Sequence, residues 1–154
     1  MKSKIKSSKL KVKGFTLVEV LIVVSIFGII AGISWSTFIA LQPSLQLGGV
    51  VRDLTTDLRD TQQRAVREQI NYGVHFSSTT REYQIIRYGG VTQEVLKKLL
   101  PGGVDFKEVT GFSNDEVVFN PYGAVREAGS VSLVNVNDVT KTIEVKPSGF
   151  VKIK

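Results

Sequence analysis

The sequence predicts an α+β fold in which a long N-terminal helix packs on an antiparallel β-sheet. Residues 15–70 hold an apolar run, followed by a stretch whose apolar residues recur every three or four positions. Residues 71–154 hold short segments rich in β-branched and aromatic residues, separated by turn residues. A helix followed by several short strands is the element order of an α+β domain.

The length of 154 residues allows one modest domain plus a membrane anchor. We divide the chain into a basic leader (1–14), a transmembrane helix (15–41), an amphipathic helix that continues it (42–70) and a β-rich ectodomain (71–154). The absence of cysteine excludes disulfides, thiolate catalysis and cysteine-bound metals.

The leader carries the excess positive charge of the chain. Its cations are Lys2, Lys4, Lys6, Lys9, Lys11 and Lys13, six of the 20 basic residues, and it contains no acidic residue. From residue 15 onward the basic and acidic residues are equal in number, so the formal net charge of +6 belongs to the leader. A basic end beside an apolar segment is evidence about membrane topology before it is evidence about a nucleic-acid partner.

Residues 15–41 are apolar on every side of a helix. Glu19 is the only charged residue among these 27. A bilayer core requires about 20 apolar helical residues, so this run is long enough to span. A buried core helix is the alternative, but such a run is rare in so small a domain. The lysines of the leader stay in the cytoplasm, which places the residues after about Leu41 outside.

A secretory signal peptide is the closest alternative, because it also joins a basic region to an apolar run. The run here exceeds the typical length of about 7–15 residues, and no small-x-small cleavage site closes it. Glu19 is the second argument against it. An ionised group inside a bilayer costs about 2.5–3.5 kcal/mol on insertion scales, and a signal peptide has no use for that cost. Glu19 therefore predicts a partner.

The residues around Glu19 carry a resemblance to a known family. Residues 13–19 read Lys-Gly-Phe-Thr-Leu-Val-Glu and precede the apolar helix. This segment resembles the prepilin processing motif of type IV pilins and type II secretion pseudopilins. The resemblance implies that a prepilin peptidase cuts after Gly14 and methylates the new N-terminal residue, Phe15. Glu19 then becomes the fifth residue of the mature chain.

Glu19 and two glycines are the expected assembly residues of this helix. Glu19 lies four positions after Phe15 on one helical face, so the amine of one subunit could meet the Glu19 carboxylate of a neighbour and set the axial register. A carboxylate that snorkels to the headgroups is the alternative. Gly28 and Gly32 form a GxxxG pattern that suits close helix packing in lipid, although glycine is also common in transmembrane helices.

Residues 42–70 continue the helix with one apolar face. Thr61 stands where the apolar stripe would take a hydrophobic residue. We interpret the charged residues opposite the stripe as a solvated face. The stripe consists of Leu47, Val50, Val51, Leu54, Leu58, Ala65 and Val66.

Nine segments of the ectodomain have strand composition: 72–76, 83–88, 91–100, 104–109, 117–120, 124–126, 130–136, 142–145 and 150–153. Their order, with Gly-Val-His-Phe at 73–76 and Leu-Pro-Gly-Gly-Val-Asp-Phe at 100–106, is similar to that of GspH/FimT-type minor pilins and pseudopilins. Members of that family are low-abundance subunits near a filament tip.

The resemblance implies a minor pilin or pseudopilin of a type IV pilus or a type II secretion pseudopilus. The implied partners are prepilin peptidase, other pilins or pseudopilins, and inner-membrane lipid before assembly. The implied location is the cytoplasmic (inner) membrane, with one span and the C-terminal domain outside the cytoplasm, and afterwards the filament.

No catalytic motif is found in the sequence. Gly111-Phe112-Ser113 lacks the final glycine of a nucleophile elbow, and no P-loop lysine and serine follow Gly102-Gly103. We interpret His75, the only histidine, as a strand residue. The chain is therefore predicted not to be an enzyme and to need no cofactor or metal.

DNA binding is the alternative function, because some FimT-type minor pilins take up DNA. The candidate contacts are Lys141, Lys146, Lys152 and Lys154, with Phe150 among them. Lys152 and Lys154 share one strand face, and phosphate contacts there would make affinity fall steeply with salt. We favour a lysine-protected edge strand over a DNA contact.

Overall fold

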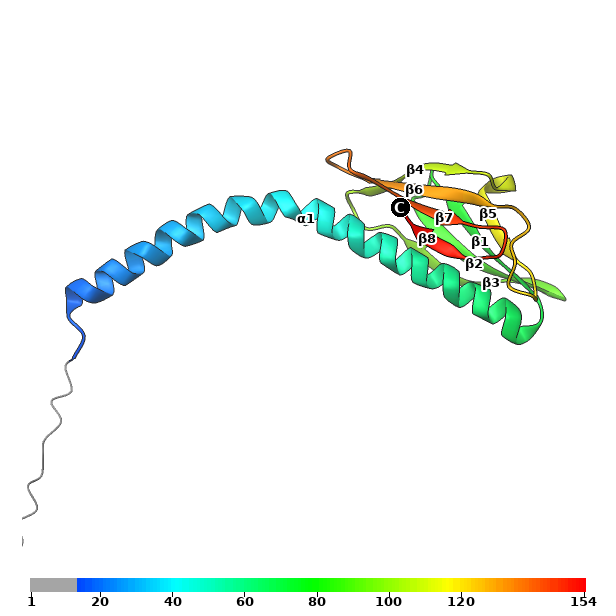
Figure 1. Cartoon of the computed structure of the whole chain (residues 1–154), viewed down its shortest axis with the longest axis horizontal. Helices are drawn as coiled ribbons and strands as arrows, with labels where there is room; N and C mark the ends of the chain where they lie inside the picture. The colour runs from blue at the N-terminus through cyan, green and yellow to red at the C-terminus, as the bar shows by residue number, and fades with distance from the viewer. Residues whose placement is uncertain (1–13) are drawn as a thin grey trace, which may run out of the picture. The chain divides into compact units, whose positions relative to one another are not determined.

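The computed structural model describes residues 14–154, except for the side chains of residues 36 and 37. The chain divides into two compact units, residues 1–39 and residues 40–154. Helix α1 (Leu17–Glu68) is 52 residues long and belongs to both (Figure 1). The second unit contains the rest of α1 and every strand found in the described residues.

Local chemistry fixes both ends of α1. At the start, the Thr16 hydroxyl accepts a hydrogen bond of 3.3 Å from the backbone N–H of Glu19. Thr16 is therefore the N-cap of the helix. At the end, Gln69 adopts a left-handed φ of 57°. Its side-chain amide donates to the Val66 carbonyl at 2.6 Å and satisfies one of the last helical acceptors.

Within the second unit, α1 buries one continuous stripe. The sequence indicated that Thr61 would interrupt this stripe, but its side chain is buried with the others. Its hydroxyl donates to the Asp57 carbonyl at 2.6 Å, so the buried polar group is satisfied within the helix. Val66, expected in the stripe, is 42% exposed instead. The buried residues of α1 are Leu47, Val51, Leu54, Thr55, Leu58, Thr61 and Ala65.

The strands form two antiparallel sheets, which confirms the predicted α+β class. The sequence analysis expected one sheet, whereas the structure contains two. The first sheet, in the order β3-β2-β1-β5, contains β1 (Asn71–Ser77), β2 (Glu82–Gly89), β3 (Val91–Leu99) and β5 (Glu116–Phe119). The second, in the order β4-β6-β7-β8, contains β4 (Val104–Thr110), β6 (Gly129–Asn135), β7 (Thr140–Val145) and β8 (Val151–Ile153).

The predicted strands recur at their expected places with one exception. The segment 124–126 makes only an isolated bridge, between Val125 and Phe119. It follows a tight turn in which the Asn120 side-chain oxygen accepts the backbone N–H groups of Tyr122 and Ala124. This turn holds the segment near β5 without a longer ladder.

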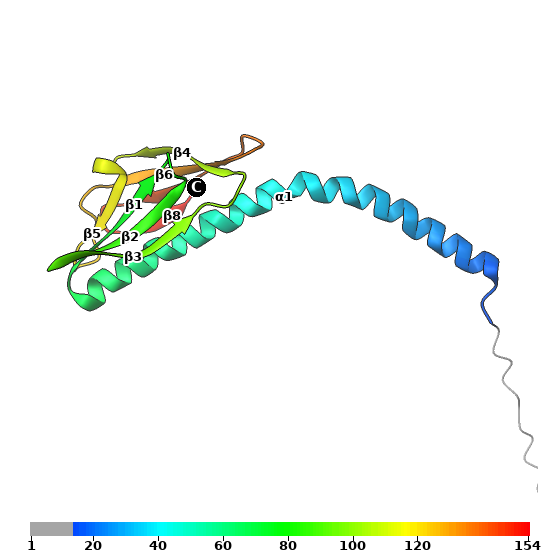
Figure 2. The ribbon, with the colours of Figure 1, turned by 180° about the vertical axis from the view of Figure 1, so that it is seen from behind.

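Helix α1 and both sheets share one hydrophobic core. Phe76 of β1 meets Phe106 of β4 edge to face, with ring centroids 5.8 Å apart, and this contact joins the two sheets. Figures 1 and 2 show the later part of α1 running beside the strands. Its flanks reach both sheets, because Asp57 contacts Lys98 of β3 and Arg59 donates to the Val151 carbonyl of β8.

Candidate processing site and ectodomain surface

The Gly14–Phe15 bond lies in non-helical backbone directly before α1. Residues 14–16 have no regular secondary structure, and Phe15 is 80% exposed. The Thr16 carbonyl accepts the first helical hydrogen bonds, from the N–H groups of Glu19 and Val20. The bond before Phe15 therefore lies outside the helical hydrogen-bond ladder and is accessible.

Glu19 lies in the first turn of α1, and its side chain is exposed. Within residues 14–154, no cation lies within ion-pair distance of its carboxylate. The sequence predicted Phe15 on the same helical face as Glu19, but α1 begins at Leu17, so an amine at Phe15 would lie four positions away in the non-helical segment before the helix. The helix N-terminus carries partial positive charge, which favours a carboxylate here. Glu19 can thus pair with a cation that comes from outside the described residues.

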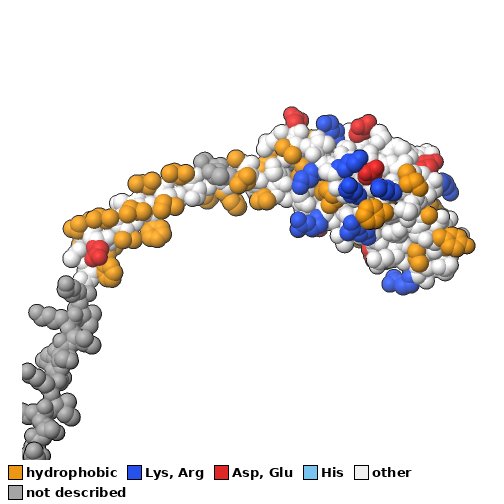
Figure 3. Space-filling model, in the orientation of Figure 1, with side chains coloured by type: hydrophobic (Ala, Val, Ile, Leu, Met, Phe, Trp, Pro, Cys, Tyr) orange, Lys and Arg blue, Asp and Glu red, His pale blue; other side chains and the backbone are white. Residues whose placement is uncertain are grey.

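Residues 17–35 are long and apolar enough to cross a membrane, with a mean hydropathy of 2.5. No residue of this window is buried, and hydrophobic side chains cover the early part of α1 (Figure 3). At Gly28 and Gly32, an added Cβ would meet no atom within 4 Å. Both glycines are therefore open to another helix.

Three of the four candidate lysines lie near one another on the outer side of β7 and β8. Lys152 pairs in register with Glu144, and Nζ of Lys154 is 3.3 Å from Glu144 Oε2. Nζ of Lys146 is 6.0 Å from the ring centroid of Phe150. Figure 3 shows Lys and Arg side chains gathered on this face of the ectodomain, with acidic side chains among them.

Lys141 does not belong to that group. Its Nζ reaches α1, 3.4 Å from the place where a Cβ on Gly48 would lie. In the β6–β7 pairing it stands opposite Leu133, a core residue. Directly paired residues point to the same face of a sheet, so Lys141 points toward the helix.

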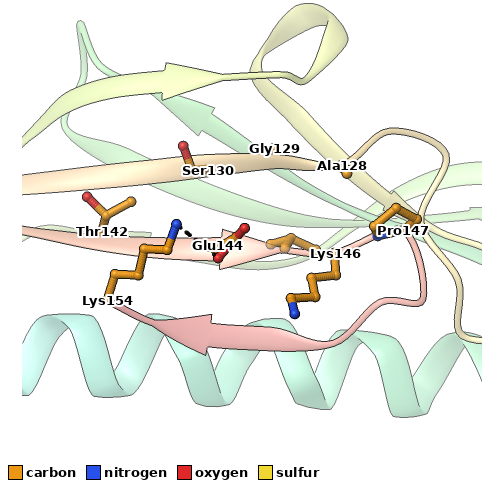
Figure 4. A pocket seen from close by; sticks show the side chains of 9 residues that line it. Ala128, Gly129, Ser130, Thr142, Glu144, Lys146, Pro147 and Lys154 are labelled. Atoms are coloured by element: carbon orange, nitrogen blue, oxygen red, sulfur yellow. Dashed lines mark ion pairs between the residues drawn. The ribbon is translucent and has the colours of Figure 1, made fainter.

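An open hollow of about 350 Å³ lies on the outer face of the second sheet (Figure 4). Ser130 and Thr142 supply hydroxyl groups to it, and Lys146 and Lys154 supply cations. Glu144 stands between the lysines and pairs with Lys154, which reduces the attraction for an anion. The hollow is chemically suited to a polar ligand with both donors and acceptors.

His75 is a half-buried residue of β1, as interpreted from the sequence. Its Nδ1 lies 3.1 Å from the Asn114 carbonyl oxygen. No group of three or more metal-binding side chains occurs in the part of the chain that the structure describes.

Two carboxylates of α1 join the helix to the first sheet, which the sequence analysis missed. Asp57 accepts from the Tyr83 hydroxyl at 2.5 Å and from Lys98 Nζ at 2.6 Å. Burial, and then the bond to Asp57, raise the pKa of the Tyr83 hydroxyl. Glu68 accepts from the Tyr72 hydroxyl at 2.9 Å, and this bond holds the pKa of the Glu68 carboxyl below its usual value.

The N-terminal segment matches a known sequence family. Residues 9–35 match the prokaryotic N-terminal methylation motif, and this range contains Gly14, Phe15 and Glu19. Residues 9–13 of the match, and the leader lysines predicted to set topology, lie outside the described residues. No curated protein matches the sequence.

Solved structures with this fold come from two filament systems. The minor pseudopilin EpsH from the type II secretion system of Vibrio cholerae is 12% identical, with a TM-score of 0.61 over 71% of this chain and 96% of that one. The type IV minor pilin FimU of Pseudomonas aeruginosa is 10% identical, with a TM-score of 0.57 over 72% of this chain and 90% of that one.

The N-terminal methylation motif and the α+β fold together make the chain similar to type IV pilin-like proteins. More particularly, its α+β fold is the one shared by a minor pseudopilin and a minor pilin, as the sequence predicted. The motif and the apolar helix behind it place the chain in the inner membrane.

Proposed function

We propose that the chain is the precursor of a minor pilin or pseudopilin, which prepilin peptidase cuts after Gly14 and methylates at Phe15. One observation carries the proposal. The Gly14–Phe15 bond is exposed and non-helical, directly before a capped apolar helix, within a segment that matches the methylation motif. Cleavage removes the basic leader and leaves a cationic amine at Phe15, four positions before Glu19.

In the filament, the apolar side chains of α1 exchange lipid for neighbouring helices. The methylated amine of one subunit then meets the Glu19 carboxylate of the next. In a medium of low dielectric constant, such a pair is stable only when each ion has its partner, because an unpaired buried charge is costly. The pair therefore favours the one axial register that brings the amine and the carboxylate together. The open positions at Gly28 and Gly32 allow a neighbouring helix to approach closely.

Mass spectrometry of the N-terminal peptide tests the processing step. The chain is expressed in membranes that contain an active prepilin peptidase, and in matched membranes that lack it. We expect a peptide that begins at Phe15 and carries one extra methyl group only in the first sample. A chain that still begins at Met1 in both samples would overturn the proposal. Cleavage beyond Ile33 would mean an ordinary signal peptide.

Substitution of Glu19 tests the assembly step separately. Glu19→Ala is expected to leave membrane insertion and cleavage intact and to reduce incorporation into filaments at least tenfold. Glu94→Ala is the matched control, because Glu94 is an exposed carboxylate on β3 with no ion pair in the described residues. Normal incorporation of the Glu19→Ala chain would contradict the pairing role.

A position near the filament tip is the finer part of the proposal. The fold similarity to a minor pseudopilin and a minor pilin supports it. The family resemblance of the sequence implies low-abundance subunits near the tip. Immunogold labelling of sheared filaments is the direct measurement. Gold at one end of each filament is expected, and labelling along the whole length would contradict a tip position.

DNA binding is the second candidate function. Lys146, Lys152 and Lys154 lie near one another beside the exposed ring of Phe150, and lysines beside an aromatic ring suit single-stranded nucleic acid. The Glu144 carboxylate among these lysines weakens the case, and Lys141 points elsewhere. The protected edge strand therefore stays the favoured interpretation of these lysines.

A salt series of gel shifts decides between the two interpretations. If single-stranded DNA binds, Lys152→Ala should reduce the slope of log affinity against log salt by about 0.7. Lys97→Ala on the first sheet is the control, because its cation is already paired with Glu82 at 2.8 Å. An absent or salt-insensitive shift would dispose of DNA binding.

A further inference from the structure

Trp35 stands at the outer end of the predicted membrane span. It is the only tryptophan of the chain, it closes the apolar window Leu17–Trp35, and its side chain is 71% exposed. An indole combines an apolar body with one N–H donor, and tryptophan is accordingly enriched at membrane–water interfaces. The sequence turns polar around it, with serine at positions 34 and 36 and threonine at 37.

The polar side chains within Leu17–Trp35 are compatible with a position inside the membrane. The Ser25 hydroxyl donates to the Leu21 carbonyl at 2.7 Å, and the Ser34 hydroxyl donates to the Ile30 carbonyl at 2.8 Å. Both hydroxyls are satisfied within the helix, which is the requirement for entering lipid. Glu19 is the only charged side chain of the window and lies at its opposite end.

Charge and hydropathy alone leave the depth of the helix open. No charged residue occurs from residue 20 to residue 51, a stretch of 32 residues, whereas a span needs about 20. Phe38, Ile39 and Leu41 are also apolar and exposed. The helix could therefore slide by several residues toward the cytoplasm without drawing a charge into the hydrocarbon. Such a slide would bury the Trp35 indole in the bilayer.

We propose that Trp35 anchors α1 at the outer boundary of the membrane and thereby places the Gly14–Phe15 bond at the cytoplasmic boundary. The helix covers the 18 positions from Leu17 to Trp35, about 27 Å at 1.5 Å per helical residue, and the non-helical residues 15 and 16 continue beyond it. The hydrocarbon core is about 30 Å thick. The partner surface of Trp35 is thus the headgroup layer of the bilayer.

This depth also suits Glu19. Glu19 is 16 helical positions from Trp35, about 24 Å, so it lies about 6 Å inside the cytoplasmic boundary of a core about 30 Å thick. A carboxylate can reach the headgroups from this depth. The anchoring of Trp35 rests on the membrane span alone. Its consequence for the scissile bond rests also on the proposed cleavage after Gly14.

Fluorescence quenching measures the depth directly, because Trp35 is the sole indole. The full-length precursor is placed in vesicles of phosphatidylcholine and phosphatidylglycerol that carry bromine at shallow, middle or deep acyl positions. We expect the strongest quenching from the shallow bromines. Strongest quenching by the deep bromines, or none from any position, would overturn the proposal.

Two variants calibrate the depth scale by moving the indole along the same helix. Phe27 and Phe38 are 67% and 64% exposed, so each accepts a larger ring without loss of packing within the described chain. The double variant W35F/F27W moves the indole about 12 Å inward and should be quenched most by deep bromines. The variant W35F/F38W moves the indole three positions outward. Because the indole sets the depth, the helix should slide about 4.5 Å toward the cytoplasm and the shallow bromines should again quench most strongly.

A second experiment asks whether Trp35 sets the depth rather than merely reports it. The chain has no cysteine, so Ile39→Cys creates a single thiol four positions outside Trp35. With Trp35 present, a membrane-impermeant maleimide should label this thiol readily from the outer side. Trp35→Leu should slow labelling severalfold because the helix slides inward, whereas Trp35→Tyr should preserve it. Equal rates in all three would show that Trp35 does not anchor the helix.

The cleavage step gives a separate readout. If Trp35→Leu slows labelling, the same variant should be cut more slowly by prepilin peptidase than the parent chain. Unchanged cleavage would overturn the link between depth and processing. Failure of the parent chain to be cut at all would instead remove the proposed function and leave the depth measurement standing.

Discussion

The Asp57 carboxylate on α1 accepts a hydrogen bond of 2.5 Å from the Tyr83 hydroxyl on β2. Asp57 also receives the Lys98 ammonium of β3 at 2.6 Å, and its side chain is only 16% exposed. Water competes little for a carboxylate in this position. These contacts therefore fix the axial position of α1 relative to the first sheet. Apolar packing alone is not directional and would fix that position less strictly.

Removal of the Asp57 carboxylate should destabilise the ectodomain by about 1–3 kcal/mol, because the Tyr83 hydroxyl then loses its partner in a buried site. The better helix propensity of alanine offsets only about 0.5 kcal/mol of this loss in Asp57→Ala. Urea unfolding of residues 40–154, which form a compact unit, is the measurement. Lys154→Ala removes one side of a solvent-exposed pair and is the control. Equal stability of the two variants would contradict the role of Asp57.

Alkaline pH should weaken the ectodomain through its tyrosines. Burial, and then the bond to Glu116, raise the pKa of Tyr88 from its ordinary value of 10.0 to about 12, and burial raises that of Tyr83 in the same direction. Between pH 10 and 12 the unfolded chain releases these protons while the folded chain keeps them. Stability is therefore complete below pH 10 and falls as the pH rises above it.

The slope of stability against pH tests this relation. Tyr88→Phe should make the decline above pH 10 shallower, since one ionising group is removed from the unfolded state. Tyr122→Phe removes a tyrosine that is 90% exposed on a turn and serves as the matched control. A Tyr88→Phe profile as steep as that of the parent chain would contradict the protection of Tyr88.

Local signals explain why most elements could be predicted from the sequence. The β-branched runs and the turns between them predict strands without knowledge of the partner strand. The division into two sheets could not be predicted in this way, because it depends on which distant strands pair. Strand β1 pairs with β5, and β4 pairs with β6, across intervening segments.

The same distinction applies to the candidate sites. Gly14, Phe15 and Glu19 lie within six residues of one chain segment, so a local motif contains them all. The Asp57–Lys98 pair joins residues 41 positions apart, and no spacing rule relates them. By contrast, the sequence did indicate that Lys141 and Lys146 lie on opposite faces of the sheet. The two are five positions apart, and strand alternation would place them on opposite faces.

Gly149 joins two turns so closely that a side chain cannot be added. Its φ is +79°, and a Cβ would overlap the Gly123 carbonyl oxygen and the Gln62 side-chain amide. Gly149→Ala should therefore cost about 2 kcal/mol or more, from the left-handed backbone and the displaced turn together. Gly102→Ala is the control, because a Cβ there meets no atom within 4 Å. Urea unfolding of residues 40–154 should separate the two, and equal stability would contradict the close contact.

Gly28 and Gly32 offer a test of helix packing that leaves the ectodomain untouched. An added Cβ at either glycine meets no atom within 4 Å, so the double variant Gly28→Leu/Gly32→Leu should insert and fold like the parent chain. In the filament, the two leucines would hold a neighbouring helix away from a surface of small residues. We expect normal membrane levels and unchanged ectodomain stability, together with at least a tenfold loss of incorporation into filaments. The variant Ile26→Leu/Ile30→Leu keeps the glycines, changes exposed apolar positions and should assemble normally. If both double variants assembled equally well, the glycines would be ordinary members of an apolar helix rather than a packing face.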